Sequence, residues 1–215
     1  MGVSPRAGLF GGVALLSAAV VLLQIVLTRI FSAMLGHHMA FLAVSLSLFG
    51  VGTGAALLHA IPALARPPAL LRRLAILSCL MSLATVGSIL FLVRQKPMTT
   101  IGAAEIGKLA LLYLESAAPF TIAGIAITGA IQHAARDMSK LYLADLVAAA
   151  AGGAAAMLAL RLGAPRAVLV VAILAALAGL WFALPLRARR RASGVPLPSK
   201  APLALVATML LGTGV

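Results

Sequence analysis

The sequence contains few charged residues: Asp, Glu, Lys and Arg make up 10% of its 215 residues, and only four of them are acidic. Hydrophobic residues account for 63% of the chain, and its mean hydropathy is +1.14. A folded chain in water needs far more polar side chain than this to cover its surface. The composition therefore excludes a water-soluble domain and indicates an integral membrane protein.

Cysteine is almost absent, since Cys79 is the only one. A single cysteine excludes an internal disulfide. Because Cys79 stands in the middle of an apolar stretch, it is expected to pack as a small hydrophobic side chain.

The motifs that usually identify an enzyme are missing too: there is no Walker loop, HExxH, GxSxG or pair of catalytic carboxylates. Residues 50–55 (GVGTGA) match the dinucleotide-binding pattern by letters alone, because no strand precedes them and no acidic residue follows about twenty positions later. His37 and His38 do not indicate a metal, because adjacent helical residues point about 100° apart and no ligand stands at a suitable spacing. No catalytic residue, cofactor or metal is expected.

Long apolar runs are what the sequence does contain. A helix needs about 20 apolar residues to span the hydrocarbon of a bilayer. Six runs have about this length: residues 9–31, 39–61, 74–93, 109–131, 141–162 and 168–186. Because a helix satisfies its backbone hydrogen bonds within lipid, residues 1–186 are predicted to form an all-α, polytopic transmembrane bundle of six spans, with consecutive helices antiparallel.

The C-terminal region differs in character. Residues 187–202 hold a basic run and three prolines, and are predicted to be a cytoplasmic loop because proline stops a helix. Residues 203–215 are apolar to the last residue but are too short to cross a bilayer at about 1.5 Å per residue. They are expected to be the start of a seventh helix, either because a longer protein is truncated near Val215 or because a partial helix ends there against a partner.

The basic residues predict an orientation. Eleven of the 17 Lys and Arg lie in the N-terminal segment and the loops on its side, and six lie on the other side. The positive-inside rule therefore places the N-terminus in the cytoplasm. The first run is expected to remain as an anchor, because it is longer than the core of a signal peptide and ends in Gln24, Thr28 and Arg29. Because the charges flank the spans without interleaved aromatic residues, membrane lipids are the expected partner and nucleic acid is not.

Polar residues at the outer ends of the spans form one candidate site: Arg29, His37, His38 and Glu115. Arg29 and Glu115 are predicted to form an ion pair that faces the bundle interior, because either charge alone in lipid would be costly. The alternative is that Arg29 extends to the lipid headgroups and Glu115 meets only Lys108 or water. The sequence leaves both open.

A second candidate site lies at the cytoplasmic ends and comprises His59, Tyr142 and Asp145. In one interpretation Asp145 is a charge near the start of its helix, satisfied by the backbone and by Arg136 or Lys140. In the other it is a polar anchor or proton-handling group beside His59.

Small residues mark two helix faces that could approach other helices closely. Gly50, Gly52 and Gly54 lie in the second run, and Gly152 and Gly153 lie in the fifth. Small side chains let helices pack closely in lipid, so these two helices are predicted to contact each other.

The fourth run is interrupted by Pro119. A proline inside a helix removes a backbone hydrogen bond, so a kink is predicted there, together with a freed carbonyl near Glu115.

Three segments carry a resemblance to a known family. Residues 27–32 (LTRIFS) and 38–52 (HMAFLAVSLSLFGVG) resemble the membrane region of bacterial spermidine synthase-like proteins. Residues 141–146 (LYLADL), with the small residues up to Gly153 and then Gly163-Ala164-Pro165, resemble a second signature of that group. The similarity covers most of residues 20–185. The matched polar positions are Thr28, Arg29, His38, Tyr142 and Asp145.

The resemblance implies a role for a chain without a catalytic motif of its own. In that family a membrane bundle is fused to a Rossmann-like aminopropyltransferase- or methyltransferase-type domain, which binds decarboxylated or ordinary S-adenosylmethionine. The resemblance implies that this chain is the membrane module of such a protein, set in the bacterial inner membrane, where it would anchor or serve a transferase domain that these 215 residues do not contain. Two alternatives stay open: a small transporter or channel component that uses Arg29, Glu115 and Asp145 along a path, and a structural subunit of a larger membrane complex.

Overall fold

The computed structural model describes the backbone of residues 4–36, 40–61, 70–94, 103–134 and 137–192. Within these ranges the chain forms α-helices and no strand. The helices are α1 (Pro5–Leu35), α2 (Ala40–Ala60), α3 (Leu70–Arg94), α4 (Ala103–His133), α5 (Met138–Arg161) and α6 (Ala164–Ala192). By length and composition all six could cross a membrane. The predicted all-α bundle of six apolar helices is confirmed, and the expected seventh helix lies outside the described residues.

The last helix is longer than its apolar run. α6 continues to Ala192 and takes in the first residues of the basic stretch that was expected to be a loop from residue 187. Arginine is a good helix former, and no proline or glycine stands between Pro185 and Gly194 to stop the helix. The remainder of that stretch, residues 193–202, lies outside the described residues.

Local sequence explains where helices begin and reverse. α1 starts at Pro5, and the Ser4 hydroxyl accepts a hydrogen bond from the Ala7 N–H at 3.2 Å. This serine caps an otherwise unsatisfied donor at the helix start. Between α5 and α6 the chain turns at Gly163, whose φ of 90° lies in the left-handed region that glycine adopts without strain. The two helices can therefore be joined by a very short connection.

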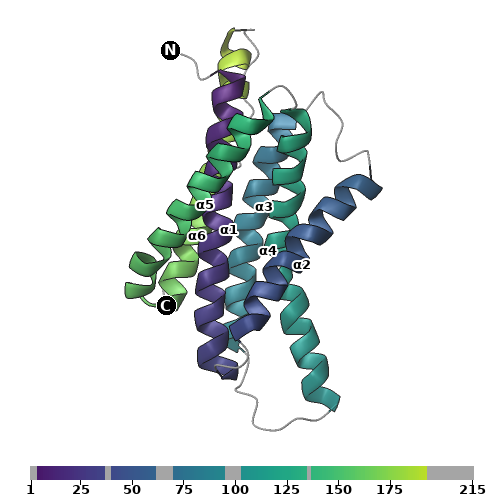
Figure 1. Cartoon of the computed structure of the whole chain (residues 1–215), viewed down its shortest axis with the longest axis vertical. Helices are drawn as coiled ribbons and strands as arrows, with labels where there is room; N and C mark the ends of the chain where they lie inside the picture. The colour runs from purple at the N-terminus through teal and green to yellow at the C-terminus, as the bar shows by residue number, and fades with distance from the viewer. Residues whose placement is uncertain (1–3, 37–39, 62–69, 95–102, 135–136, 193–215) are drawn as a thin grey trace.

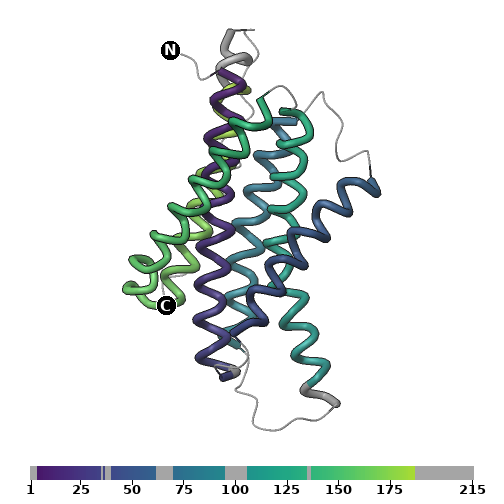
Figure 2. Tube along the Cα trace, in the orientation of Figure 1, coloured from purple at the N-terminus to yellow at the C-terminus, as the bar shows by residue number. Residues whose placement is uncertain are grey.

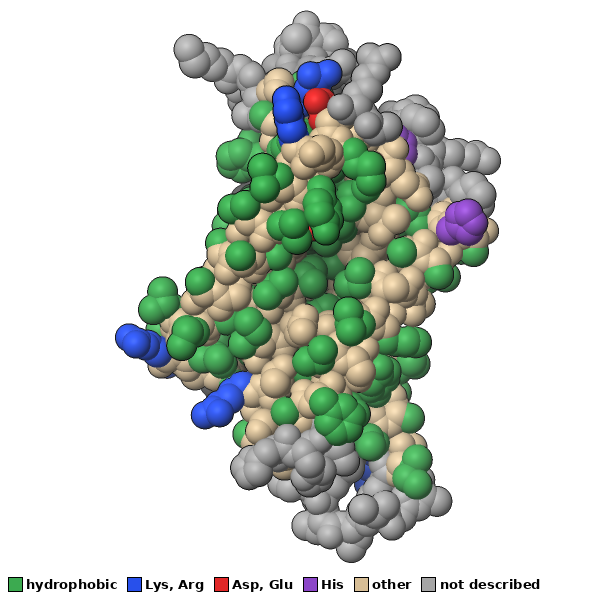
Figure 3. Space-filling view, in the orientation of Figure 1, with side chains coloured by type: hydrophobic (Ala, Val, Ile, Leu, Met, Phe, Trp, Pro, Cys, Tyr) green, Lys and Arg blue, Asp and Glu red, His purple; other side chains and the backbone are tan. Residues whose placement is uncertain are grey.

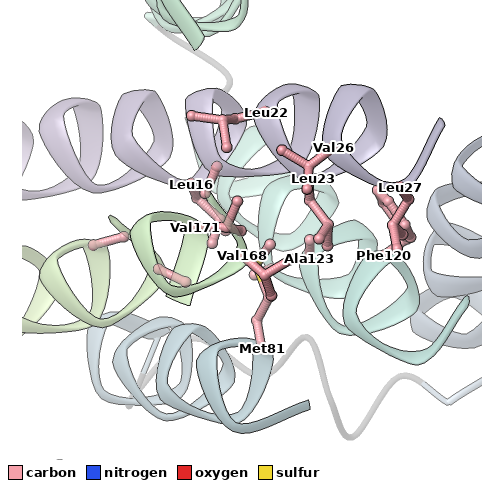
Figure 4. Close-up of a cluster of buried hydrophobic side chains, with 14 of the residues drawn as sticks. Leu16, Leu22, Leu23, Val26, Leu27, Met81, Phe120, Ala123, Val168 and Val171 are labelled. Atoms are coloured by element: carbon pink, nitrogen blue, oxygen red, sulfur yellow. The ribbon is translucent and has the colours of Figure 1, made fainter. Parts of the chain in front are cut away.

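The helices alternate in direction along the length of the bundle (Figure 1). We call the end that holds Pro5, His133 and Met138 the N side, and the opposite end the far side. At the centre of the bundle, side chains from α1, α3, α4 and α6 meet (Figure 4). Leu16, Met81, Phe120 and Val171 are fully buried there, one from each of these helices.

α2 and α5 lie against the outside of this core. α5 packs along α1 and α2 packs along α4, and both are inclined to the bundle axis (Figure 2). α5 is the least buried of the six helices, with 17% of its most apolar window buried. Because most of its surface is apolar and uncovered, this surface is suited to contact with lipid.

The predicted contact between the second and fifth helices is wrong, because each uses its glycines against a different helix. A Cβ on Gly50 or Gly54 would collide with α4, and a Cβ on Gly152 would collide with the backbone of α1 at Ala18. Gly153 faces the same helix at ordinary contact distances. Gly52 faces open space and takes no part in packing.

A third close approach joins the two ends of the described chain. The glycines Gly11 and Gly12 of α1 leave room for the rings of Trp181 and Phe182 of α6. The indole N–H of Trp181 donates a hydrogen bond to the Ala7 carbonyl at 3.1 Å. The indole N–H of a tryptophan in an apolar helix thus has a polar partner at the N side, where α1 begins and α6 ends.

Candidate functional site

A hydrogen bond between two side chains joins α1 to α5 inside the bundle. The hydroxyl of Ser17 donates to the Oδ1 atom of Asp145, and Ser17 is 3% exposed while Asp145 is half-buried. Asp145 lies seven residues beyond the start of α5, which corresponds to about 10 Å along the helix. The carboxyl group is therefore within the apolar span and not in its first turn.

This position bears on the two interpretations of Asp145. A carboxylate in the first turn would have been satisfied by free backbone N–H groups. Asp145 instead has a buried hydroxyl as its partner, while His59 and Lys140 are exposed near the ends of their helices and Arg136 lies outside the described residues. Within the described residues the partner of Asp145 is Ser17 and not His59 or Lys140, and the part of the first interpretation that rests on Arg136 stays a prediction.

The chemistry of the pair leaves room for a further ligand. A carboxyl group accepts several hydrogen bonds, and Ser17 supplies one. A charge within an apolar span is costly unless it is paired. A proton or a cationic donor on Asp145 would remove that cost, so the pair is a chemically reasonable place to bind either.

The Ser17 side of α1 continues as a polar stripe, which we define as Ser17, Gln24 and Thr28. Seven residues make about two helical turns, so Gln24 and Thr28 lie on nearly the same face of α1 as Ser17. Gln24 and Thr28 are half-buried, and the Thr28 hydroxyl donates to the Gln24 carbonyl at 2.8 Å. The stripe extends from the Asp145 level toward the far side.

The predicted ion pair between Arg29 and Glu115 is not formed. Arg29 is exposed and Glu115 is half-buried, and within the part of the chain that the structure describes no ion pair connects them. The interior face of α1 at this level is taken by Leu27, Ile30 and Phe31, which are all buried. Arg29 therefore points outward, as the alternative interpretation required.

The fourth helix satisfies the carbonyl that its proline frees. Pro119 has no N–H to donate to the Glu115 carbonyl four residues earlier, and the Ser88 hydroxyl of α3 donates to that oxygen at 2.9 Å. The predicted free carbonyl near Glu115 is thus confirmed, and α3 provides its partner. The next residue, Ser116, has a buried hydroxyl without a partner among the described residues.

Among the remaining candidates, the two that the structure describes do not form a site together. His59 and Tyr142 are exposed on α2 and α5, and His37 and His38 lie outside the described residues. At the N-side surface, Arg6 and Asp137 form an ion pair at 3.5 Å, which links the start of α1 to the residue before α5. Exposed pairs of this kind contribute little to stability.

Comparison of the chain with known proteins gives no match: no family model, no curated protein and no solved structure matches it.

Ser17 is the functional candidate that the sequence did not reveal. A serine among leucines and alanines is unremarkable in a transmembrane helix, since it can bond to its own backbone. The signal that could have identified it is its two-turn spacing from Gln24, together with an acidic residue in another span.

Proposed function

We propose that this chain is the membrane module of a spermidine synthase-like protein, set in the bacterial inner membrane with its N side facing the cytoplasm. The module would anchor, and present a substrate to, an S-adenosylmethionine-type transferase domain outside these 215 residues. The contact between Ser17 and Asp145 supports this most. Asp145 belongs to a segment that resembles the family. A carboxyl group inside a span is also a functional candidate because it costs free energy to keep a charge in the apolar part of the membrane.

Asp145 would bind the ammonium group of an amine substrate. An ammonium group provides both the positive charge and the N–H donors that a half-buried carboxylate in an apolar span lacks. The carboxyl group is about 10 Å from the N-side start of α5, which is within reach of an extended amine entering from that side. A transferase domain on the cytoplasmic side would then act on the end of the amine that remains near the surface.

A transfer assay in native membranes tests this proposal. The protein is tagged in its natural gene with its flanking sequence kept, and membranes are supplied with a labelled aminopropyl or methyl donor. Transfer should require the protein and should fall in Asp145→Ala, while Cys79→Ser, which changes a side chain far from the pair, should keep the parent rate. Equal transfer with and without the protein would contradict the proposal.

A small transporter is the second candidate, and the arrangement of α2 and α5 favours it. The path that the sequence suggested along Arg29, Glu115 and Asp145 does not support it, because Arg29 is exposed and does not meet Glu115. The support comes from the way the two outer helices each pack on the opposite half of the chain. A structural subunit of a larger complex remains the third candidate.

A further inference from the structure

The helix contacts of the first half of the chain recur in the second half. α5 packs along α1 as α2 packs along α4, and α6 packs against α1 as α3 packs against α4. The contact between α3 and α6 joins corresponding helices of the two halves. These five contacts are the most extensive in the bundle. When α1 is exchanged with α4, α2 with α5 and α3 with α6, the same five contacts result.

The closest approaches recur in the same way. Gly152 of α5 meets the backbone of α1 at Ala18, and Gly50 of α2 meets α4 at Ala117 and Phe120. The sequence separation from Gly50 to Gly152 equals that from Ala18 to Phe120. Both outer helices therefore use a glycine at the corresponding place to touch the long first helix of the other half.

The second half is inverted relative to the first. Three helices are an odd number, so α4 starts on the far side whereas α1 starts on the N side (Figure 1). Corresponding helices are thus antiparallel, which fits a two-fold axis in the plane of the membrane. Inverted repeats of this kind are a common basis of secondary transporters, where two arrangements of the same halves open the protein to opposite sides.

The two halves differ in two pairs of contacts: one is that α5 packs against α6, whereas the corresponding contact between α2 and α3 is weaker. The other is that α2 packs against α1 over an appreciable length, whereas the corresponding contact between α5 and α4 is slight. The surface is hollowed between α5 and α2 on the face shown in Figure 3. Two equivalent halves would have a second state of equal energy in which the α1–α2 and α4–α5 contacts exchange roles, and this is the arrangement that inverted repeats use for alternating access.

We infer that this chain is an inverted repeat of two three-helix halves, and that it alternates between the described state and one in which α5 closes on α4 while α2 leaves α1. The slight contact between α4 and α5 lies where α4 ends and α5 begins, on the N side, and the contact between α1 and α2 lies on the far side, so the inferred exchange would open the chain to the N side in the described state and to the far side in the other. Ser17 and Asp145 lie on α1 and α5, whose contact belongs to the set that both states share, so their hydrogen bond joins the two halves in either state. The inference goes beyond the proposed function and needs no transferase domain.

Cross-linking tests the exchange without knowledge of the solute. In a Cys79→Ser background, Ser32→Cys and Val44→Cys form the far-side pair on α1 and α2, and Thr128→Cys with Leu143→Cys form the N-side pair on α4 and α5. Each pair is cross-linked in lipid vesicles with a short bis-maleimide, alone and in a combined variant, and the products are quantified by mass spectrometry. Both pairs should cross-link when present alone.

In the combined variant, molecules that carry both cross-links should be on the order of tenfold rarer than the product of the single yields, because the two contacts belong to different states. The control combines the far-side pair with Ile76→Cys and Leu180→Cys on α3 and α6, whose contact is the same in both states, and should give the product of the single yields. Double cross-links at the product of the single yields, or no cross-link at the N-side pair, would overturn the inference. Transfer activity plays no part in this readout, so its failure and that of the proposed function are distinguishable.

Discussion

Asp145 is an acidic residue within an apolar span, where lipid favours hydrophobic side chains. Its carboxyl group lies within a span and accepts a hydrogen bond from Ser17 on another helix. The sequence identified Asp145 because an acidic residue in an apolar run is rare and costly. The two-turn spacing from Gln24 marks Ser17 as a candidate, but it does not show which serine faces the acid, because that depends on the rotation of two helices that are far apart in the chain.

A double-mutant cycle measures this pair. Ser17→Ala and Asp145→Leu should together cost about 1 kcal/mol less than the sum of their separate costs, within the roughly 0.6–1.7 kcal/mol found for hydrogen bonds between membrane helices. Unfolding of the protein in detergent provides the free energies. Arg29→Ala with Glu115→Ala is the matched control and should be additive, because these residues form no ion pair. Additive costs at Ser17 and Asp145 would mean that they do not interact.

Ser88 offers a second test at the scale of single atoms. Ser88→Ala removes the donor to the Glu115 carbonyl, and leaving a buried carbonyl unsatisfied costs about 1–3 kcal/mol. In a Pro119→Ala background the backbone N–H of residue 119 can take over that carbonyl, so the same Ser88→Ala change should cost clearly less. An equal cost in both backgrounds, measured by thermal unfolding in detergent, would show that Ser88 stabilises the bundle in some other way.

At the scale of helices, glycines decide which elements approach closely. The six spans could be predicted from sequence because length and apolar composition depend on the segment alone. The partners of α2 and α5 could not. A row of small residues shows that a backbone can be approached but contains no information on which helix approaches it, so α2 and α5 were paired wrongly.

Gly50, Gly52 and Gly152 provide a graded test of these contacts. Gly50→Leu and Gly152→Leu force a side chain against another helix backbone and should each destabilise the bundle by about 1–3 kcal/mol or more. Gly52→Leu faces open space and should leave the melting temperature unchanged or raise it, since leucine favours helix more than glycine does. Equal melting temperatures for all three variants in detergent would contradict these packing assignments.

At the scale of the whole molecule, orientation follows from the count of basic residues on the two sides of the membrane. Ser139 is exposed on the N side and Lys108 is exposed on α4 toward the far side. If eleven of the 17 basic residues hold the N side in the cytoplasm, a membrane-impermeant maleimide added to intact cells should label Lys108→Cys and leave Ser139→Cys unlabelled, both in a Cys79→Ser background. Opening the cells should then allow Ser139→Cys to react. Labelling of Ser139→Cys alone in intact cells would reverse the orientation, and with it the side toward which the described state is open. Labelling of both positions in intact cells would mean that the chain inserts in both orientations, a result that the excess of basic residues on one side argues against.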